Sequence, residues 1–460
     1  MRSGRLLILA VVVLALGAYI FFFERHQPTT EEVRQQADKV LPDLKRDQIA
    51  ALEIRSSHGL VKIVKTPEKQ WKLVKPIEYP ADESAVRSLV TGLVDLKINR
   101  SLKPGEVRPA EYGLDKPKLS VVVETKDGAR RELKLGSKAA LGADRAVSVG
   151  DGRILLCSDT LSGDLEKGLD GWRSHRVVEL FPDQLASVEI TAGKDHIQAV
   201  RDGQLWKLLQ PVKDLADRDH IRNLVSGLNT LKVEQFLDSS ADLHELGLDK
   251  PRYRVVLVRS EGAKPVELDF GRLDKTNGAT RVACRRGGKD LFWVNDRAEN
   301  ALGLAPVLWR SKKVYPFESW NVQAATFTRG KESVSVERKE GVWKVAGGAA
   351  ANGSEVLSRL GKLSELRAID FDLIASGPKE MGRVALKIGS DAGVSAKKAQ
   401  PAKVTFTFFE PLSPHGRALV RVDARATTMS VEAAKARQIL ADLGALKAKP
   451  KPTPAAKEKT

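Results

Sequence analysis

The chain is poor in the residues from which catalytic and metal sites are usually built. Its 460 residues include only 2 cysteines and 7 histidines. No two histidines have the i, i+4 spacing of a helical zinc site. The glycine-rich motifs that bind phosphates or dinucleotides are missing, as is the turn that presents a nucleophilic serine. We therefore expect no catalytic residue, no metal and no cofactor, and we predict that the protein is not an enzyme.

Cysteine is too rare for a disulfide framework. Two cysteines, Cys157 and Cys284, occupy different places in the duplicated segment described below, so no disulfide was copied with it. Single buried cysteines are common in protein cores. We expect two buried thiols, with one disulfide between them as the alternative.

Acidic residues are also too few to balance the basic ones, which leaves a net charge of +17. Such an excess can serve nucleic-acid binding, but the N-terminus indicates another location. The unbroken apolar run 6–23 would span roughly 27 Å as a helix, close to the thickness of a bilayer. Arg2 and Arg5 precede it, which favours a cytoplasmic N-terminus. We predict a single-pass inner-membrane protein whose bulk is periplasmic and which binds no nucleic acid.

A cleaved signal peptide is the alternative explanation for this run, with 15–17 as a small-residue cleavage site. The run continues past that site and exceeds the usual signal core of about 7 to 15 residues. We therefore favour an uncleaved anchor.

One segment of the chain is repeated after about 135 residues. Trp71, followed by Lys-Leu and a proline, returns as Trp206, and the pentapeptide Gly-Leu-Asp-Lys-Pro at 113–117 returns at 247–251. A third, degenerate copy keeps Trp343 but lacks the pentapeptide. Short β-branched runs and one amphipathic helix in each copy predict an α+β fold of three tandem repeats, each an antiparallel sheet with helices packed on it.

The predicted organisation follows from these repeats. It consists of a transmembrane anchor at 1–26, a tether at 27–44, α+β repeats at 45–182, 183–318 and 319–446, and a disordered basic tail at 447–460. The tail could contact an anionic cell-wall polymer or lipid, although most such tails are simply solvated.

Capping residues are expected at the start of each amphipathic helix: Asp82, Asp217 and, in the third copy, Ser354. Trp71, Trp206 and Trp343 occupy equivalent strand positions. We expect them to fill the cores, with a row of sugar-stacking platforms as the alternative.

Backbone requirements explain most of the pentapeptide, because its glycine suits a positive φ and its proline an extended start to the next strand. Its two charged residues are left over as candidate interaction positions, namely Asp115, Lys116, Asp249 and Lys250. The first two copies close with a Trp-Arg pair, Trp172-Arg173 and Trp309-Arg310. We hypothesise that these pairs pack at junctions between successive repeats.

Five features together resemble the bacterial domain-of-unknown-function 4340 family. They are the N-terminal apolar run, the Trp-Lys-Leu strand followed by proline, the helix that begins after an aspartate, the Tyr-Gly-Leu-Asp-Lys-Pro turn and the Leu135-Gly136 hairpin end. The resemblance covers most of residues 1–320. It implies an accessory component that acts beside ABC-2-type transporter subunits and gliding-type auxiliary proteins, and it brings no catalytic residues.

These observations predict a non-enzymatic, membrane-anchored accessory or scaffold protein of an envelope complex, with an ABC-type transporter among its partners. Two alternatives remain from other classes. One is a module that binds cell-wall glycan or lipid, and the other, more remote, is a periplasmic enzyme of unknown type.

Overall fold

The computed structural model describes residues 38–103, 107–139, 142–260, 263–276, 279–297, 302–373, 378–389, 402–410 and 416–448. The predicted anchor, most of the predicted tether and the tail beyond residue 448 lie outside these ranges. Within the ranges, no helix is both long enough and apolar enough to cross a bilayer. The chain divides into two compact units, with the division between His175 and Arg176.

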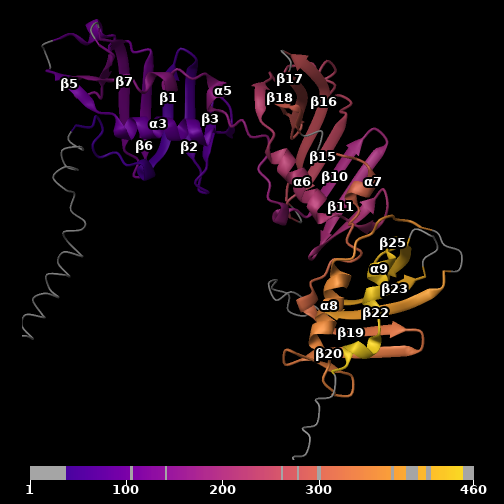
Figure 1. The fold of residues 1–460 in the computed structure, drawn as a ribbon. Coiled ribbons are helices and arrows are strands. Elements are labelled where there is room, and N and C mark those ends of the chain that lie inside the picture. Colours follow the sequence, from indigo (N-terminus) through magenta and orange to yellow (C-terminus); the bar gives the residue numbers. More distant parts are fainter. Residues whose placement is uncertain are drawn as a thin grey trace, which may run out of the picture. The chain divides into compact units, whose positions relative to one another are not determined.

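The first unit is built on one antiparallel sheet with the strand order β4-β3-β2-β1-β6-β7-β8-β9-β5 (Figure 1). Its strands are β1 (Ile49–Ser56), β2 (Gly59–Lys65), β3 (Trp71–Lys75), β4 (Tyr79–Pro80), β5 (Ile98–Leu102), β6 (Leu119–Thr125), β7 (Arg130–Lys138), β8 (Asp144–Ser148) and β9 (Ile154–Ser158). We call it sheet I.

Helix α3 (Glu83–Asp95) lies across one face of sheet I (Figure 1). Asp82 caps it as predicted, since its side chain accepts a hydrogen bond from the Ala85 backbone N–H. Residues spaced three and four apart, including Val86, Leu89 and Leu93, are fully buried against the sheet. Two short helices, α4 (Ser162–Leu165) and α5 (Leu169–Trp172), close the unit.

The second unit contains two sheets. Sheet II has the order β13-β12-β11-β10-β15-β16-β17-β18-β14, the same arrangement as sheet I. Its strands are β10 (Ser187–Ala192), β11 (Asp195–Asp202), β12 (Leu205–Gln210), β13 (Asp214–Leu215), β14 (Val233–Phe236), β15 (Tyr253–Val258), β16 (Val266–Thr276), β17 (Ala279–Arg286) and β18 (Asp290–Asn295). Helix α6 (Arg218–Asn229) packs on it, capped by Asp217, and α7 (Pro306–Trp309) follows.

Sheet III has the order β21-β20-β19-β22-β23-β24-β25. Its strands are β19 (Val322–Arg329), β20 (Glu332–Lys339), β21 (Val342–Val345), β22 (Glu380–Ile388), β23 (Ala402–Phe409), β24 (Arg417–Val422) and β25 (Thr428–Glu432). Helices α8 (Gly353–Ser364) and α9 (Ala433–Ile439) accompany it. The architecture is thus three antiparallel sheets with few helices.

The cap predicted for α8 was wrong. Asn352, not Ser354, is the N-cap: its side chain accepts from the Glu355 backbone N–H, and the Ser354 hydroxyl donates to the Asn352 side chain at 2.8 Å. The helix begins one residue before Ser354, which places that serine inside the first turn.

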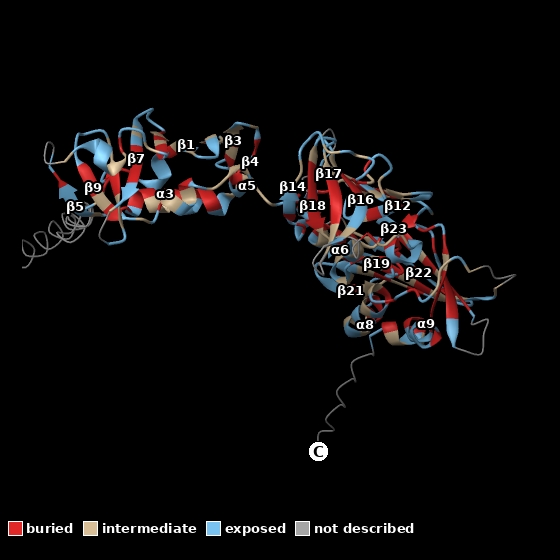
Figure 2. Cartoon of the chain, turned by 90° about the horizontal axis from the view of Figure 1, so that it is seen from above, coloured by how far each residue is buried: buried red, intermediate tan, exposed pale blue. Residues whose placement is uncertain are grey.

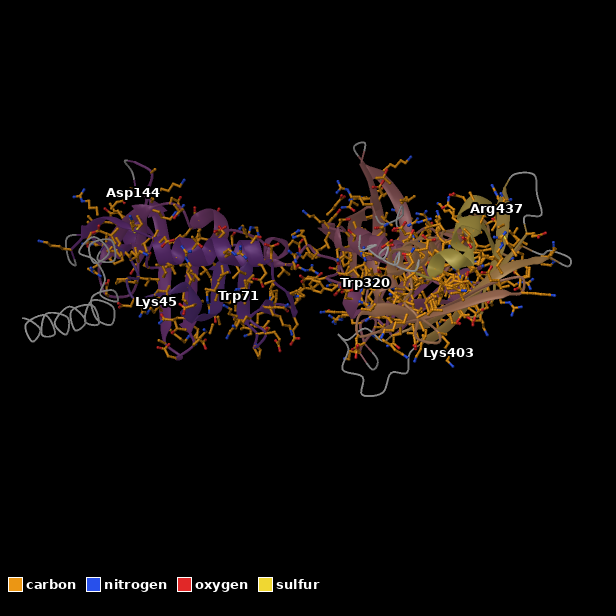
Figure 3. All side chains as sticks on the ribbon, turned by 60° about the horizontal axis from the view of Figure 1, so that its bottom comes forward. Lys45, Trp71, Asp144, Trp320, Lys403 and Arg437 are labelled. Carbon is orange, nitrogen blue, oxygen red and sulfur yellow. The ribbon has the colours of Figure 1, made fainter. Side chains whose placement is uncertain are left out.

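Each sheet has its own apolar core, visible as buried stripes on strands and helices in Figure 2. Trp71, Trp206 and Trp343 belong to these cores and are only 9%, 5% and 4% exposed. They fill space as predicted, and the sugar-platform alternative loses the exposed rings that it required. Trp320 in η6 (Ser319–Asn321), labelled in Figure 3, is by contrast 65% exposed.

The described end of the predicted tether belongs to the first core. Val40, Leu41 and Leu44 are each at most 5% exposed and join the core of sheet I. The Val40 N–H also donates to the Leu96 carbonyl at 2.9 Å. Three apolar side chains are thus enough to fold the end of the predicted tether onto the sheet.

Candidate functional site

The repeated pentapeptide forms a tight turn whose shape explains its glycine and leucine. Gly113 and Gly247 have φ values of 67° and 65°, as predicted. Leu114 and Leu248 are buried in small apolar clusters separate from the main cores. A second glycine packs beneath each turn: a Cβ on Gly136 would lie 2.1 Å from the Tyr112 carbonyl oxygen, and one on Gly271 would lie 2.2 Å from that of Leu246.

The charged members of the pentapeptide, Asp115, Lys116, Asp249 and Lys250, are exposed in both copies. The structure does not bring them together with the closing Trp-Arg pairs. They remain surface positions.

The tryptophans of the closing pairs are structural. Trp172 and Trp309 are fully buried, each in the core of its own sheet. Their carbonyl oxygens accept from the backbone N–H of Asp82 at 2.9 Å and of Asp217 at 2.8 Å, the two residues that cap α3 and α6. Each tryptophan therefore ties the end of its repeat back to the start of the repeat's own helix.

The arginines of the two pairs have different surroundings. Arg173 forms a β-bridge with Ala81, and its guanidinium lies 4.4 Å from the centre of the Tyr79 ring. Arg310 forms the corresponding bridge with Ala216, but its Nε donates to Asp214 Oδ2 at 2.7 Å. Tyr79 and Asp214 are equivalent, because they pair with Leu73 and Leu208 in β4 and β13.

Asp214 lies at the centre of a set of four charges between sheets II and III, of which three are buried and the fourth, Asp372, is 61% exposed. We call Asp214, Arg310, Asp372 and Arg425 the junction cluster. The side chains of Asp214 and Arg425 are completely buried, and that of Arg310 is 6% exposed. The Oδ1 atom of Asp214 accepts hydrogen bonds from Arg425 Nε at 2.7 Å and from the Leu215 N–H at 2.8 Å. The Oδ2 atom accepts hydrogen bonds from Arg425 Nη2 at 2.8 Å and from Arg310 Nε.

Arg425 reaches the cluster from the loop between β24 and β25 in sheet III. Its Nη1 donates to the carbonyl oxygens of Lys313 at 2.8 Å and Val314 at 3.0 Å, on the segment that connects the two sheets. The ring of Phe371 lies 4.3 Å from the Arg310 guanidinium and 5.7 Å from that of Arg425.

Asp372 completes the cluster at its outer side. It accepts a bidentate pair of hydrogen bonds from Arg310 and one at 2.8 Å from the Thr427 hydroxyl. These bonds, the one from Arg310 first, hold the pKa of the Asp372 carboxyl below its usual value of 3.8. Two carboxylates thus balance two guanidiniums, which is the condition under which buried charges are tolerated.

The cluster is suited to holding two sheets together. Both oxygens of Asp214 already accept two hydrogen bonds each, and the guanidiniums are directed at carboxylates and carbonyls. In the described part of the chain, no group of three or more His, Cys, Asp or Glu side chains could hold a metal ion. The sequence singled out Arg310 but missed its partners.

Both cysteines are free and buried, so the disulfide alternative is not formed. Burial raises the pKa of the Cys157 thiol to about 12 and that of Cys284 further. Both thiols are therefore protonated and unreactive at neutral pH.

Comparison with known families matches the model described as Domain of unknown function (DUF4340) twice, over residues 71–251 and 206–386. The chain belongs to this family. The DUF4340 matches overlap and run from the Trp71 strand into sheet III, so they cover most of the described chain. No curated protein is detectably similar to the chain in sequence.

Among solved structures, the DNA polymerase III subunit beta from Pseudomonas aeruginosa aligns with a TM-score of 0.17 and 10% identity, covering 87% of this chain and 96% of that one. A DNA polymerase sliding clamp from the same organism, solved with a ligand, aligns with a TM-score of 0.15 and 10% identity, covering 87% and 95%. TM-scores this low carry no argument about fold or function.

Proposed function

We propose that this DUF4340 protein is a non-catalytic scaffold of the bacterial envelope, anchored in the inner membrane and facing the periplasm, where it joins an ABC-type transporter complex. The observation that carries the proposal is the use of the buried charges. The three buried charges of the junction cluster, Asp214, Arg310 and Arg425, all join sheet II to sheet III, and such a rigid link supports a platform for partner proteins.

We further propose that sheet III is a diverged third copy of the repeated unit. Its order β21-β20-β19-β22-β23-β24-β25 matches β3-β2-β1-β6-β7-β8-β9 of sheet I strand by strand. Its helix α8 follows the tryptophan strand, as α3 and α6 do. Tandem copies of one domain enlarge the surface available for binding without adding new catalytic groups, which suits a scaffold better than an enzyme.

The proposed membrane attachment rests on the sequence alone. The apolar run 6–23 and the arginines before it support an anchor whose C-terminal side is periplasmic. Protease added to spheroplasts should digest the bulk of the chain, while protection of the bulk until lysis would contradict the proposed orientation.

Affinity purification tests the partner claim. We expect ABC-transporter subunits to be enriched when the tagged chain is isolated from membranes in a mild detergent. The matched comparison is the same chain with the exposed pairs changed, Asp115→Ala with Lys116→Ala and Asp249→Ala with Lys250→Ala, which should fold normally and lose partners if these positions form the contact surface. Enrichment of no envelope protein over an unrelated tagged periplasmic protein would contradict the scaffold role.

A further inference from the structure

Each of the three sheets carries two basic residues held side by side at the same place. An isolated antiparallel bridge joins the segment before the first strand to the segment after the long helix, and it pairs Lys39 with Lys97, Arg176 with Lys232, and Lys313 with Arg367. Residues directly opposite each other in such a bridge project to the same side, and like charges there are destabilising. Six basic residues at six such positions call for an explanation beyond folding.

The third pair lacks the neutralising partner that the other two have. Lys39 contacts Asp95 at 3.1 Å, and Arg176 contacts Glu179 at 3.2 Å. Lys313 and Arg367 are both exposed, and neither has an acidic partner within the described ranges. An unneutralised pair of cations is a ready site for an anion.

A cleft of about 420 Å³ opens beside this third pair, between sheets II and III. Its wall combines the first turn of α6, the start of β12 and the connecting segment 311–318. Clefts between domains are the usual location of small-molecule sites, and this volume lies in their usual range of about 300 to 1,000 Å³.

The lining of the cleft combines positive charge with aromatic surface. Five basic side chains line it against three acidic ones, and two of the acidic ones are already engaged: Asp217 caps α6, and Asp219 contacts Arg222 at 3.3 Å. Glu318 is the remaining carboxylate, on the far end of the connecting segment. Trp206, Tyr315 and Phe317 supply apolar lining.

We propose that this cleft binds a phosphate group carried by an organic molecule, with Lys313 and Arg367 as the ligands of the phosphate and Lys312 adding charge. Within the described ranges these three side chains have no acidic partner, and three positive charges suit the double charge of a phosphate monoester better than the single charge of a carboxylate. The aromatic wall takes the organic part. The site is independent of the scaffold role, because it needs no protein partner.

Calorimetric titration of the full-length chain in a neutral detergent tests the site with two probes. Glycerol 3-phosphate represents a soluble phosphate ester, and dihexanoyl phosphatidic acid below its micellar concentration represents a lipid headgroup. We expect saturable binding of at least one probe. Tighter binding of the phosphatidic acid identifies a lipid headgroup as the source, and equal or tighter binding of glycerol 3-phosphate identifies a soluble phosphate ester.

The variant with Lys313→Gln and Arg367→Gln should weaken this binding about 10-fold or more, because it removes the two charge-assisted hydrogen bonds proposed to hold the phosphate. Arg176→Gln with Lys232→Gln is the matched control, because it removes the equivalent pair of sheet II and neither residue lines the cleft. Thermal unfolding confirms that both variants fold. Failure of both probes to bind, or equal loss of binding in the two variants, overturns the proposal.

Discussion

Among single side chains, Asp214 has the largest effect that the structure predicts. Asp214→Asn removes the only completely buried negative charge of the junction cluster and leaves Arg425 buried without its carboxylate. Loss of one partner from a buried ion pair usually costs about 3–5 kcal/mol. We expect a loss of this size in the free energy of unfolding of the second unit, measured with urea.

The exposed Asp115 provides the control for this change. Asp115→Asn should alter the free energy of unfolding by less than about 0.5 kcal/mol, as surface substitutions usually do. A loss below 1 kcal/mol for Asp214→Asn would mean that the cluster contributes little to joining the sheets.

Both cysteines should be inert in the folded protein. Because burial raises their pKa values and covers the sulfur atoms, a thiol reagent such as DTNB should label neither Cys157 nor Cys284 at pH 8. Both should be labelled after unfolding in guanidinium chloride without reductant. Fast labelling of the native chain would show that one of the cores opens.

Asp372 makes the junction sensitive to acid. Its pKa is lower in the folded state than the usual 3.8, so its stabilising effect is complete above that value and is lost as the pH falls through the folded-state pKa. We expect the Tm of the second unit to fall more steeply below pH 4 in the natural chain than in Asp372→Asn. Parallel Tm profiles of the two proteins would contradict this assignment.

Among the elements, the turn that each pentapeptide forms depends on a second glycine that packs closely against the backbone of the turn. Gly136→Ala would place a methyl group 2.1 Å from the Tyr112 carbonyl oxygen, which forces β7 and the turn apart. Overpacking of this kind typically destabilises by about 1–3 kcal/mol. Chemical unfolding of the first unit measures the loss.

We expect Gly361→Ala, in contrast to Gly136→Ala, to stabilise the protein, because Gly361 lies in a helix with free space around it. Nothing lies within 4 Å of the added methyl group in α8, so alanine should stabilise this helix by about 0.5–1 kcal/mol. If both glycine variants were destabilising to the same extent, close packing would not explain Gly136.

The elements were also the part of the structure that local sequence patterns predict best. Apolar periodicity identified α3 and α6, and the aspartate before each identified its cap, because both signals lie within one turn of chain. The cap of α8 was missed because Asn352 and Ser354 are both good capping residues, and only the bend of the chain decides between them.

The junction cluster could not be predicted in the same way. Arg310 is 96 residues from Asp214 and 62 from Asp372, and Asp214 is 211 residues from Arg425. No periodicity links positions so far apart. The sequence does show that Tyr79 and Asp214 differ at equivalent strand positions. This difference points to the cluster only once the structure shows that Arg173 stacks on the tyrosine whereas Arg310 binds the aspartate.

For the whole molecule, the division at residue 175 predicts two separate unfolding transitions in differential scanning calorimetry. Asp214→Asn should lower the temperature of one transition, and Gly136→Ala that of the other, because the two residues lie in different units. A single transition shifted by both variants would mean that the units unfold cooperatively.

The difference between Asp214 in β13 and Tyr79 in β4 also affects how a chain of similar domains assembles. Sheets I and II share a strand order and could compete for the same neighbour as the polypeptide emerges. Only sheet II offers a carboxylate to receive Arg425, whereas the matching site on sheet I presents a phenol ring. Arg425 docked beside Tyr79 would lack the carboxylate that Asp214 provides, so we expect Asp214 to favour the pairing of sheet III with sheet II over a pairing with sheet I.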